Sequence, residues 1–176
     1  MINNSKSKEL LTFTARRSRK TQLPPPCEVI DRVQSLTALG VVINDRLSAT
    51  DHVNAVLSSC SGLLYALRIL RTHGMPTSSL HDVFRATIVA KILYGSPAWS
   101  GLCSAADRSR LNALLRRCKR YNYCSNDFPA IEDLFFDADD TLFKRFVYYP
   151  AHVLHPILPA KSEQPYNHAR KATQLL

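Results

Sequence analysis

Apolar residues recur at three- and four-residue spacings from about residue 50 onward, a period that predicts helices. The first such stretch begins at Thr50 or Asp51. It is expected to stop at Gly74, a residue that readily takes a left-handed cap, and Pro76 follows. We therefore expect one long amphipathic helix that buries a single face. The apolar positions on that face are Val53, Val56, Leu57, Cys60, Leu63, Leu64, Leu67 and Leu70.

A second helix is expected directly after this turn. Its N-cap is expected at Thr77 or Ser78, because short hydroxyl side chains accept hydrogen bonds from the first backbone N–H groups of a helix. Gly95 and Pro97 are expected to end it. Its buried stripe repeats at every fourth position and consists of Leu80, Phe84, Ile88 and Ile92.

A third helix is expected to open at Ser104 and Asp107. One arc of it is apolar and comprises Leu111, Leu114, Leu115 and Cys118. The rest of its surface is basic and carries Arg108, Arg110, Arg116, Arg117, Lys119 and Arg120. This helix is the strongest cationic surface that the pattern predicts.

The first 50 residues contain a different pattern. Residues 1–27 carry six cations against one acid, Glu9, and read as a polar arm or hairpin with one short strand near Leu10, Leu11 and Phe13. A second strand is expected over Leu39-Gly-Val-Val-Ile43, before the turn pair Asn44-Asp45. The predicted fold is therefore mainly α, with a small N-terminal β-hairpin, a helical bundle and a shorter C-terminal helical region. The expected divisions are residues 1–47, 48–124, 125–160 and a polar tail over 161–176.

The charge balance narrows the choice of partner. The 176 residues carry 23 Lys and Arg against 14 Asp and Glu, a formal net charge of +9, which favours polyanions. No apolar run approaches the roughly 20 residues of a membrane span, and the first residues lack the apolar core of a secretory signal. Five scattered cysteines favour reduced thiols. We expect an intracellular protein, cytoplasmic or nuclear, with no membrane and no small-molecule substrate.

Asp139-Asp140 could be taken for the paired aspartates that hold two Mg²⁺ ions in polymerases. Such a pair needs a tight turn between apolar strands, whereas the neighbouring apolar residues follow helical spacing. We therefore expect an acidic helix, with no catalytic residue and no bound cofactor in this chain. That helical spacing is set by Leu134, Phe135, Ala138, Leu142 and Phe143.

Two further sets of side chains have a structural and a functional interpretation. Cys118, Cys124, His152 and His155 could ligate zinc, but the cysteines are spaced more widely than a C-x₂-C pair, and Cys118 and Cys60 are better explained as core. Trp99 is likewise expected in the core rather than stacked on a base. Tyr121 and Tyr123 follow the basic helix and offer stacking surfaces beside its cations. Nucleic-acid binding is favoured over a merely solvated helix face, because the local and total charge agree.

Several longer segments, in this order, resemble the reverse transcriptases of non-LTR (LINE-type) retrotransposons, over about residues 3–159. Residues 2–8 resemble the palm, residues 39–45 the primer-grip hairpin and residues 51–53 the start of the thumb. More specific are Leu67-Arg-Ile-Leu-Arg-Thr-His-Gly-Met-Pro, Val89-Ala-Lys-Ile-Leu-Tyr-Gly-Ser-Pro-Ala-Trp, Asp107-Arg-Ser-Arg-Leu, Leu115-Arg-Arg-Cys-Lys-Arg, Ala138-Asp-Asp-Thr-Leu-Phe and His152-Val-Leu-His-Pro-Ile-Leu-Pro.

The resemblance implies a parent RNA-directed DNA polymerase that uses Mg²⁺ and catalytic aspartates lying upstream of this part. The chain resembles a truncated fragment with the palm remnant, primer grip and thumb, which binds RNA, DNA or an RNA/DNA hybrid and is inactive alone. The expected phosphate contacts are Arg108, Arg116, Arg117, Lys119 and Arg120, with Gly40 permitting close backbone approach. The alternatives are a helix-turn-helix DNA reader formed by residues 51–73 and 78–94, and an inert helical relict.

Overall fold

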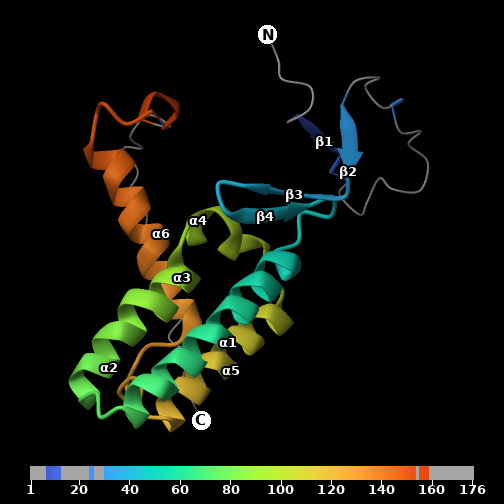
Figure 1. Ribbon diagram of the computed structural model, residues 1–176. Coiled ribbons are helices and arrows are strands. Elements are labelled where there is room, and N and C mark those ends of the chain that lie inside the picture. Colours follow the sequence, from blue (N-terminus) through green and yellow to red (C-terminus); the bar gives the residue numbers. More distant parts are fainter. Residues whose placement is uncertain (1–6, 13–23, 26–29, 154, 159–176) are drawn as a thin grey trace, which may run out of the picture. The chain divides into compact units, whose positions relative to one another are not determined.

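The computed structural model describes residues 7–12, 24–25, 30–153 and 155–158 (Figure 1). Helices make up most of it, and a short antiparallel hairpin precedes them, which confirms the predicted mainly α fold with a small N-terminal hairpin. The chain divides into two compact units, residues 1–141 and 142–176, which are described separately. The four finer divisions expected from the sequence stay a prediction.

Four short strands begin the first unit. β1 (Lys8–Leu10) pairs in parallel with β2 (Asp31–Val33), and Lys8 and Asp31 form an ion pair of 2.7 Å across them. β3 (Ser35–Ala38) pairs antiparallel with β4 (Val41–Asn44). The strand expected near Leu10, Leu11 and Phe13 is wrong in its bounds, because β1 ends at Leu10. Phe13 lies outside the described residues.

The turn between β3 and β4 corrects another strand boundary. Leu39 and Gly40 both adopt left-handed backbone angles, with φ of 48° and 80°. Two such residues form the tight turn whose twist matches that of antiparallel strands. The predicted strand therefore starts two residues too early, at Leu39 rather than at Val41. Its end at Asn44, before a turn, is as expected.

α1 (Thr50–Thr72) has the bounds that the apolar period predicts, and Gly74 follows it with φ of 82°. Among the apolar positions, Val53, Val56, Cys60, Leu64 and Leu67 are buried and the others are half-buried. Within the described part of the chain, α1 is the one helix long and apolar enough to cross a membrane by length and composition alone. Core helices of helical bundles have the same length and apolar composition.

α2 (Thr77–Phe84), a π-helical turn (Arg85–Val89) and α3 (Ala90–Leu93) follow one another without a break. The stripe predicted for this segment is confirmed, since its four apolar residues are all buried. Positions four apart turn about 400° around an α-helix, so such a stripe drifts by about 40° at each step. The wider π turn reduces that drift and keeps Ile88 and Ile92 facing the core.

At each end of this segment, one of the predicted residues has a different role. Its N-cap is Pro76, and no side chain caps it, so Thr77 is simply the first helical residue. Gly95, with φ of 59°, ends the segment as expected. Pro97 does not end it, because it lies in the first turn of the next helix, α4 (Ser96–Trp99). Proline suits that position, where its missing N–H would have no partner in any case.

Trp99 lies at the centre of the first unit. Its side chain is 1% exposed, and its Nε1 donates a hydrogen bond to the Tyr94 carbonyl oxygen at 3.1 Å. Its ring packs edge to face against His52, at 4.7 Å between ring centroids, and against Phe135, at 5.2 Å. The expectation that Trp99 is a core residue rather than a base-stacking one is confirmed.

A 3₁₀ turn (Ser100–Leu102) leads to α5 (Ala105–Arg120), which Ser104 and Asp107 open through a capping box, as predicted. Its apolar arc is buried. α6 (Ile131–Tyr148) carries Asp139 and Asp140 inside a helix, so they are not the hairpin pair of a polymerase centre. In the second unit Phe146 packs against Phe143, and the last described helix is a 3₁₀ turn (His155–Ile157).

His52 fastens the hairpin to α1 and predicts a pH dependence. The Val42 N–H donates to His52 Nδ1 at 3.3 Å, so that nitrogen must be unprotonated. Burial, and then the charge of Lys91, lower the pKa of His52. The unfolded chain therefore binds the proton more readily than the folded one. The contribution of neutral His52 to the free energy of unfolding is complete above about pH 6.5 and is lost as the pH falls below that value.

We therefore expect the free energy of unfolding, measured with urea, to decrease between pH 7 and pH 5. The control is His52→Gln, which keeps a hydrogen-bond acceptor but cannot titrate, and its stability is expected to vary less over the same range. An identical pH profile in the two proteins would contradict the role assigned to His52.

Candidate nucleic-acid interface

A single carboxylate joins the N-terminal ends of α1 and α5. Asp107 accepts hydrogen bonds from Ser104 Oγ at 2.7 Å and from Thr50 Oγ1 at 3.0 Å. Asp107 is only 1% exposed. Burial alone would raise the pKa of Asp107, but the hydrogen bonds from Ser104 and Thr50, with the charge of Arg110, lower it below its ordinary value. The ionised carboxylate therefore holds the two helix starts together.

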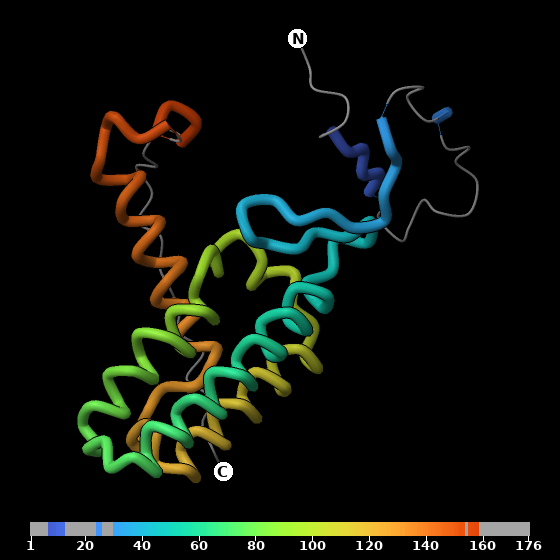
Figure 2. Tube along the Cα trace, viewed as in Figure 1, coloured from blue at the N-terminus to red at the C-terminus, as the bar shows by residue number. Residues whose placement is uncertain are grey.

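The same helices are tied at two further levels. Arg110 donates to Asn54 Oδ1 at 2.7 Å, and Arg71, in the last turn of α1, donates to the Tyr121 carbonyl oxygen at 2.8 Å, just beyond α5. The N-terminal end of α1 lies beside that of α5, and their C-terminal ends also lie beside each other. The two helices therefore run parallel and side by side (Figure 2). Three cross-links at different heights fix the space between them.

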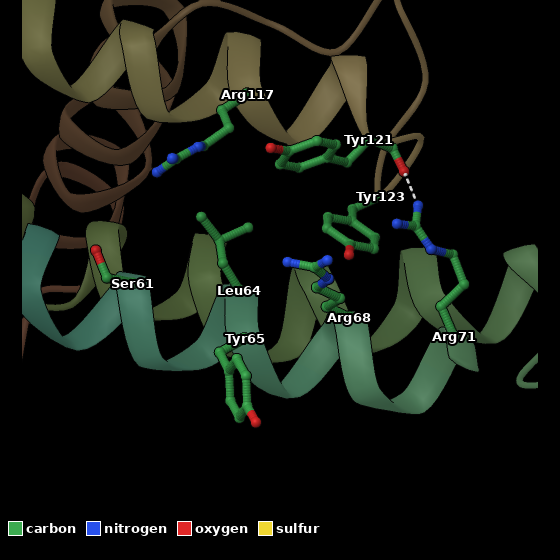
Figure 3. Close-up of a pocket in the computed structure, with 8 residues that line it drawn as sticks. All are labelled: Ser61, Leu64, Tyr65, Arg68, Arg71, Arg117, Tyr121 and Tyr123. Carbon is green, nitrogen blue, oxygen red and sulfur yellow. Dashed lines mark hydrogen bonds between the residues drawn. The ribbon is translucent and has the colours of Figure 1, made fainter. Parts of the chain in front are cut away.

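Two adjoining hollows lie along this pair of helices. The first, of about 330 Å³, is lined by Ser61, Leu64, Tyr65, Arg68, Arg71, Arg117, Tyr121 and Tyr123 (Figure 3). The second, of about 410 Å³, is lined by Leu57, Ser61, Arg110, Ala113, Leu114, Arg117 and Arg120. Both include Ser61 and Arg117, so the two hollows adjoin, and together we call them the α1–α5 groove.

The groove is strongly cationic. Five arginines line it, Arg68 and Arg71 from α1 and Arg110, Arg117 and Arg120 from α5, and no acidic side chain does so among the residues that line the two hollows. Arg110 lies 3.6 Å from Asp107, whereas the other four have no acidic partner within residues 30–153. Figure 3 shows the guanidinium groups of Arg68 and Arg117 directed into the space between the helices. Permanently charged groups gathered in this way favour an anion.

The aromatic side chains of the groove have different roles. Tyr123 is buried and forms part of its floor, with the guanidinium carbon of Arg71 5.0 Å from the ring centroid. The expectation that Tyr123 offers a stacking surface is therefore wrong. Tyr121 is 39% exposed, with Arg120 5.5 Å from its ring, and Tyr65 on α1 is 67% exposed. These two remain accessible at the rim.

The structure divides the predicted phosphate contacts among three surroundings. Arg117 and Arg120 line the groove, while Arg116 is exposed and lies outside it. Arg108 donates to the Ser100 carbonyl oxygen at 3.3 Å, and Lys119 donates to the Phe128 carbonyl oxygen, so both already bind backbone. The basic residues of α5 therefore do not form one surface.

Sequence reasoning missed the other wall of the groove. The sequence indicates Arg68 and Arg71 only as part of a longer resembling segment, although their three-residue spacing puts them on one face of α1. That spacing was the available signal. It could not indicate that this face lies beside Arg117, because that depends on how α1 and α5 pack.

Gly40 lies away from the groove, at the tip of the hairpin. A Cβ at this position would come 3.2 Å from Cε1 of Tyr94, whose hydroxyl donates to the Leu39 carbonyl oxygen at 3.1 Å. The close backbone approach that glycine permits here is thus to a ring of the same chain. The expected approach of nucleic acid to Gly40 stays a prediction.

The cysteines considered as metal ligands, Cys118 and Cys124, belong to the core, as does Cys60. Cys60 and Cys118 are buried, as expected, and burial raises their pKa to about 11 and about 12, so both are thiols at neutral pH. Across the described ranges, no three His, Cys, Asp or Glu side chains lie close enough together to hold a metal ion.

The chain was compared with protein-family models, with curated proteins and with solved structures. None of the three finds a match.

Proposed function

We propose that this chain is part of the reverse transcriptase of a non-LTR retrotransposon and binds template and primer strands of RNA, DNA or their hybrid through the α1–α5 groove. The observation that carries the proposal is the groove itself, with five arginines and no acidic lining residue. The ordered segments that resemble that family support the same assignment: α5 contains residues 107–111 and 115–120, and α1 contains residues 51–53 and the first part of residues 67–76.

The chemistry of such binding is electrostatic. Guanidinium groups donate paired hydrogen bonds to phosphate oxygens and release condensed counterions, without reading the base sequence. Nucleotide transfer needs aspartates that hold Mg²⁺, and Asp139 and Asp140 lie within a helix instead. In this proposal the chain contributes binding, and the upstream part of the parent enzyme contributes catalysis.

A structural explanation for some of these arginines also exists. Cations near helix C-termini offset the helix dipole, and Arg71, Arg117 and Arg120 lie in the last turns of α1 and α5. Arg68 and Arg110 lie before those last turns, so the dipole gives no reason for their presence in the groove. Arg110 binds Asn54 and lies beside Asp107, so Arg68 is the arginine whose presence a polyanion explains and neither the dipole nor a cross-link does.

Neighbouring arginines of α5 provide a matched test. Arg117 lines the groove and Arg116 does not, although both are exposed. For a labelled RNA/DNA hybrid that carries an unpaired overhang, we expect Arg117→Ala to weaken binding about 3- to 10-fold and to lower the slope of log affinity against log salt by roughly 0.7 to 0.9, the loss of one phosphate contact. Arg116→Ala is expected to behave as wild type.

Equal effects of Arg116→Ala and Arg117→Ala would show that the groove is not the binding site. If the wild-type protein bound no nucleic acid at low ionic strength, the proposed ligand would be wrong. A second control, Arg85→Ala with Lys91→Ala, removes two exposed cations from the helix that follows α1. Selective loss of binding to duplex DNA in that control would favour the helix-turn-helix alternative instead.

A further inference from the structure

We infer that the α1–α5 groove holds an unpaired, single-stranded stretch of nucleic acid rather than a duplex. This inference rests on the proposed function, since it specifies which form of nucleic acid the same groove takes. It would apply to an unpaired stretch of RNA or DNA next to the paired template and primer. Three features of the groove carry it.

The first feature is the width of the groove. The axes of two packed helices lie about 8–10 Å apart. A nucleic-acid duplex is much wider than this space, since its major groove alone, about 12 Å across, can admit a whole helix. α1 and α5 cannot separate freely, because Asp107, Arg110 and Arg71 bind across them at three levels. Hollows of about 330 and 410 Å³ fit a few linked nucleotides, not a double helix.

The second feature is that cations line both walls. Arg68 from α1 and Arg117 from α5 point into the same space (Figure 3). A single backbone that enters this space can bind both guanidinium groups at once. Arg71 is already held by the Tyr121 carbonyl oxygen and the Tyr123 ring, so it shapes the wall.

The third feature is the pair of exposed aromatic rings. Tyr121 lies on the α5 side of the first hollow, and Tyr65 comes from the α1 side with its ring directed away from α5 (Figure 3). Bases in a duplex stack on one another, whereas unpaired bases are free to stack on aromatic side chains. Accessible tyrosines beside a row of phosphate-binding arginines are the combination used on single strands. We assign phosphates to Arg68 and Arg117, and bases to Tyr65 and Tyr121.

The test measures fluorescence anisotropy with a labelled mixed-sequence 12-nucleotide DNA, an RNA of the same sequence and their blunt duplexes, at one salt concentration. We expect each single strand to bind at least about tenfold more tightly than its duplex. Tyr65→Leu with Tyr121→Leu should weaken single-strand binding about tenfold, within the range of one to two lost stacking contacts, and leave the salt slope unchanged. Duplex binding should not change.

The matched control is Tyr148→Leu with Tyr149→Leu, which removes two exposed tyrosines that do not line the groove. Emission of Trp99 and thermal unfolding check that each variant is folded. Equal or tighter binding of the duplex, or wild-type affinity in the Tyr65 and Tyr121 variant, would overturn the inference. If either result is obtained and duplex binding still depends on Arg117, the proposed function stands and only the preference for a single strand is wrong. If Arg117→Ala changes no complex, both fall.

Discussion

Replacing Trp99 by alanine is expected to lower the free energy of unfolding by about 3–5 kcal/mol, the range for removing a large buried aromatic side chain. The ring is almost fully buried and contacts His52, which fastens the hairpin, and Phe135 of α6. The change would leave a cavity between these elements and would also leave the Tyr94 carbonyl oxygen without its donor. We therefore expect the hairpin and the helices to lose stability together.

Urea unfolding followed by far-ultraviolet circular dichroism measures this effect, since Trp99 is the only tryptophan and its emission disappears in the variant. Trp99→Phe is the control, because it keeps most of the ring contacts and loses the hydrogen bond. Its expected cost is about 1–2 kcal/mol. A Trp99→Ala protein within about 1 kcal/mol of wild type would show that this ring is not central to the core.

Asp107→Ala is expected to cost about 2–4 kcal/mol, from the loss of a helix cap and of hydrogen bonds to a buried charged group. The carboxylate closes the capping box with Ser104 and also accepts from Thr50, so one substitution weakens both the start of α5 and its attachment to α1. Loosening this end should also reduce oligonucleotide binding, because the groove needs both helices in place.

Asp107→Asn separates the two contributions. The amide oxygen can still cap the helix, so its cost should be clearly smaller than that of the alanine variant. Because the pKa of Asp107 is lowered in the folded protein, its contribution is present above about pH 4 and is lost as the pH falls through the folded pKa. The stability difference between wild type and Asp107→Ala should therefore shrink in acid. A difference independent of pH would contradict the role of the ionised carboxylate.

The order, length and buried faces of the helices could be predicted from the sequence. Apolar spacing placed α1 between Thr50 and the turn at Gly74, and it identified the four-residue stripe from Leu80 to Ile92. The Ser104 and Asp107 pair marked the start of α5. These features are local, since a helix period and a cap depend on residues within a few positions of one another.

Strand bounds were predicted less well. β2 is three residues long and contains Asp31 and Arg32, so it has no alternating apolar pattern to detect, and its partner β1 lies more than 20 residues earlier. The apolar side chain of Leu39 favours a strand, but its backbone is left-handed in the turn. Pairing across the chain, rather than local preference, decides such positions.

The sequence by itself determined that this protein is a basic, mainly helical chain, with its strongest cluster of cations on α5. Only the tertiary structure decided which of those cations share a surface. A helical period fixes the direction of a side chain relative to the axis of its own helix, and it carries no information about the neighbouring helix. Packing of α1 beside α5 brought Arg68 to Arg117, left Arg116 outside the groove, and turned Lys119 to the Phe128 carbonyl.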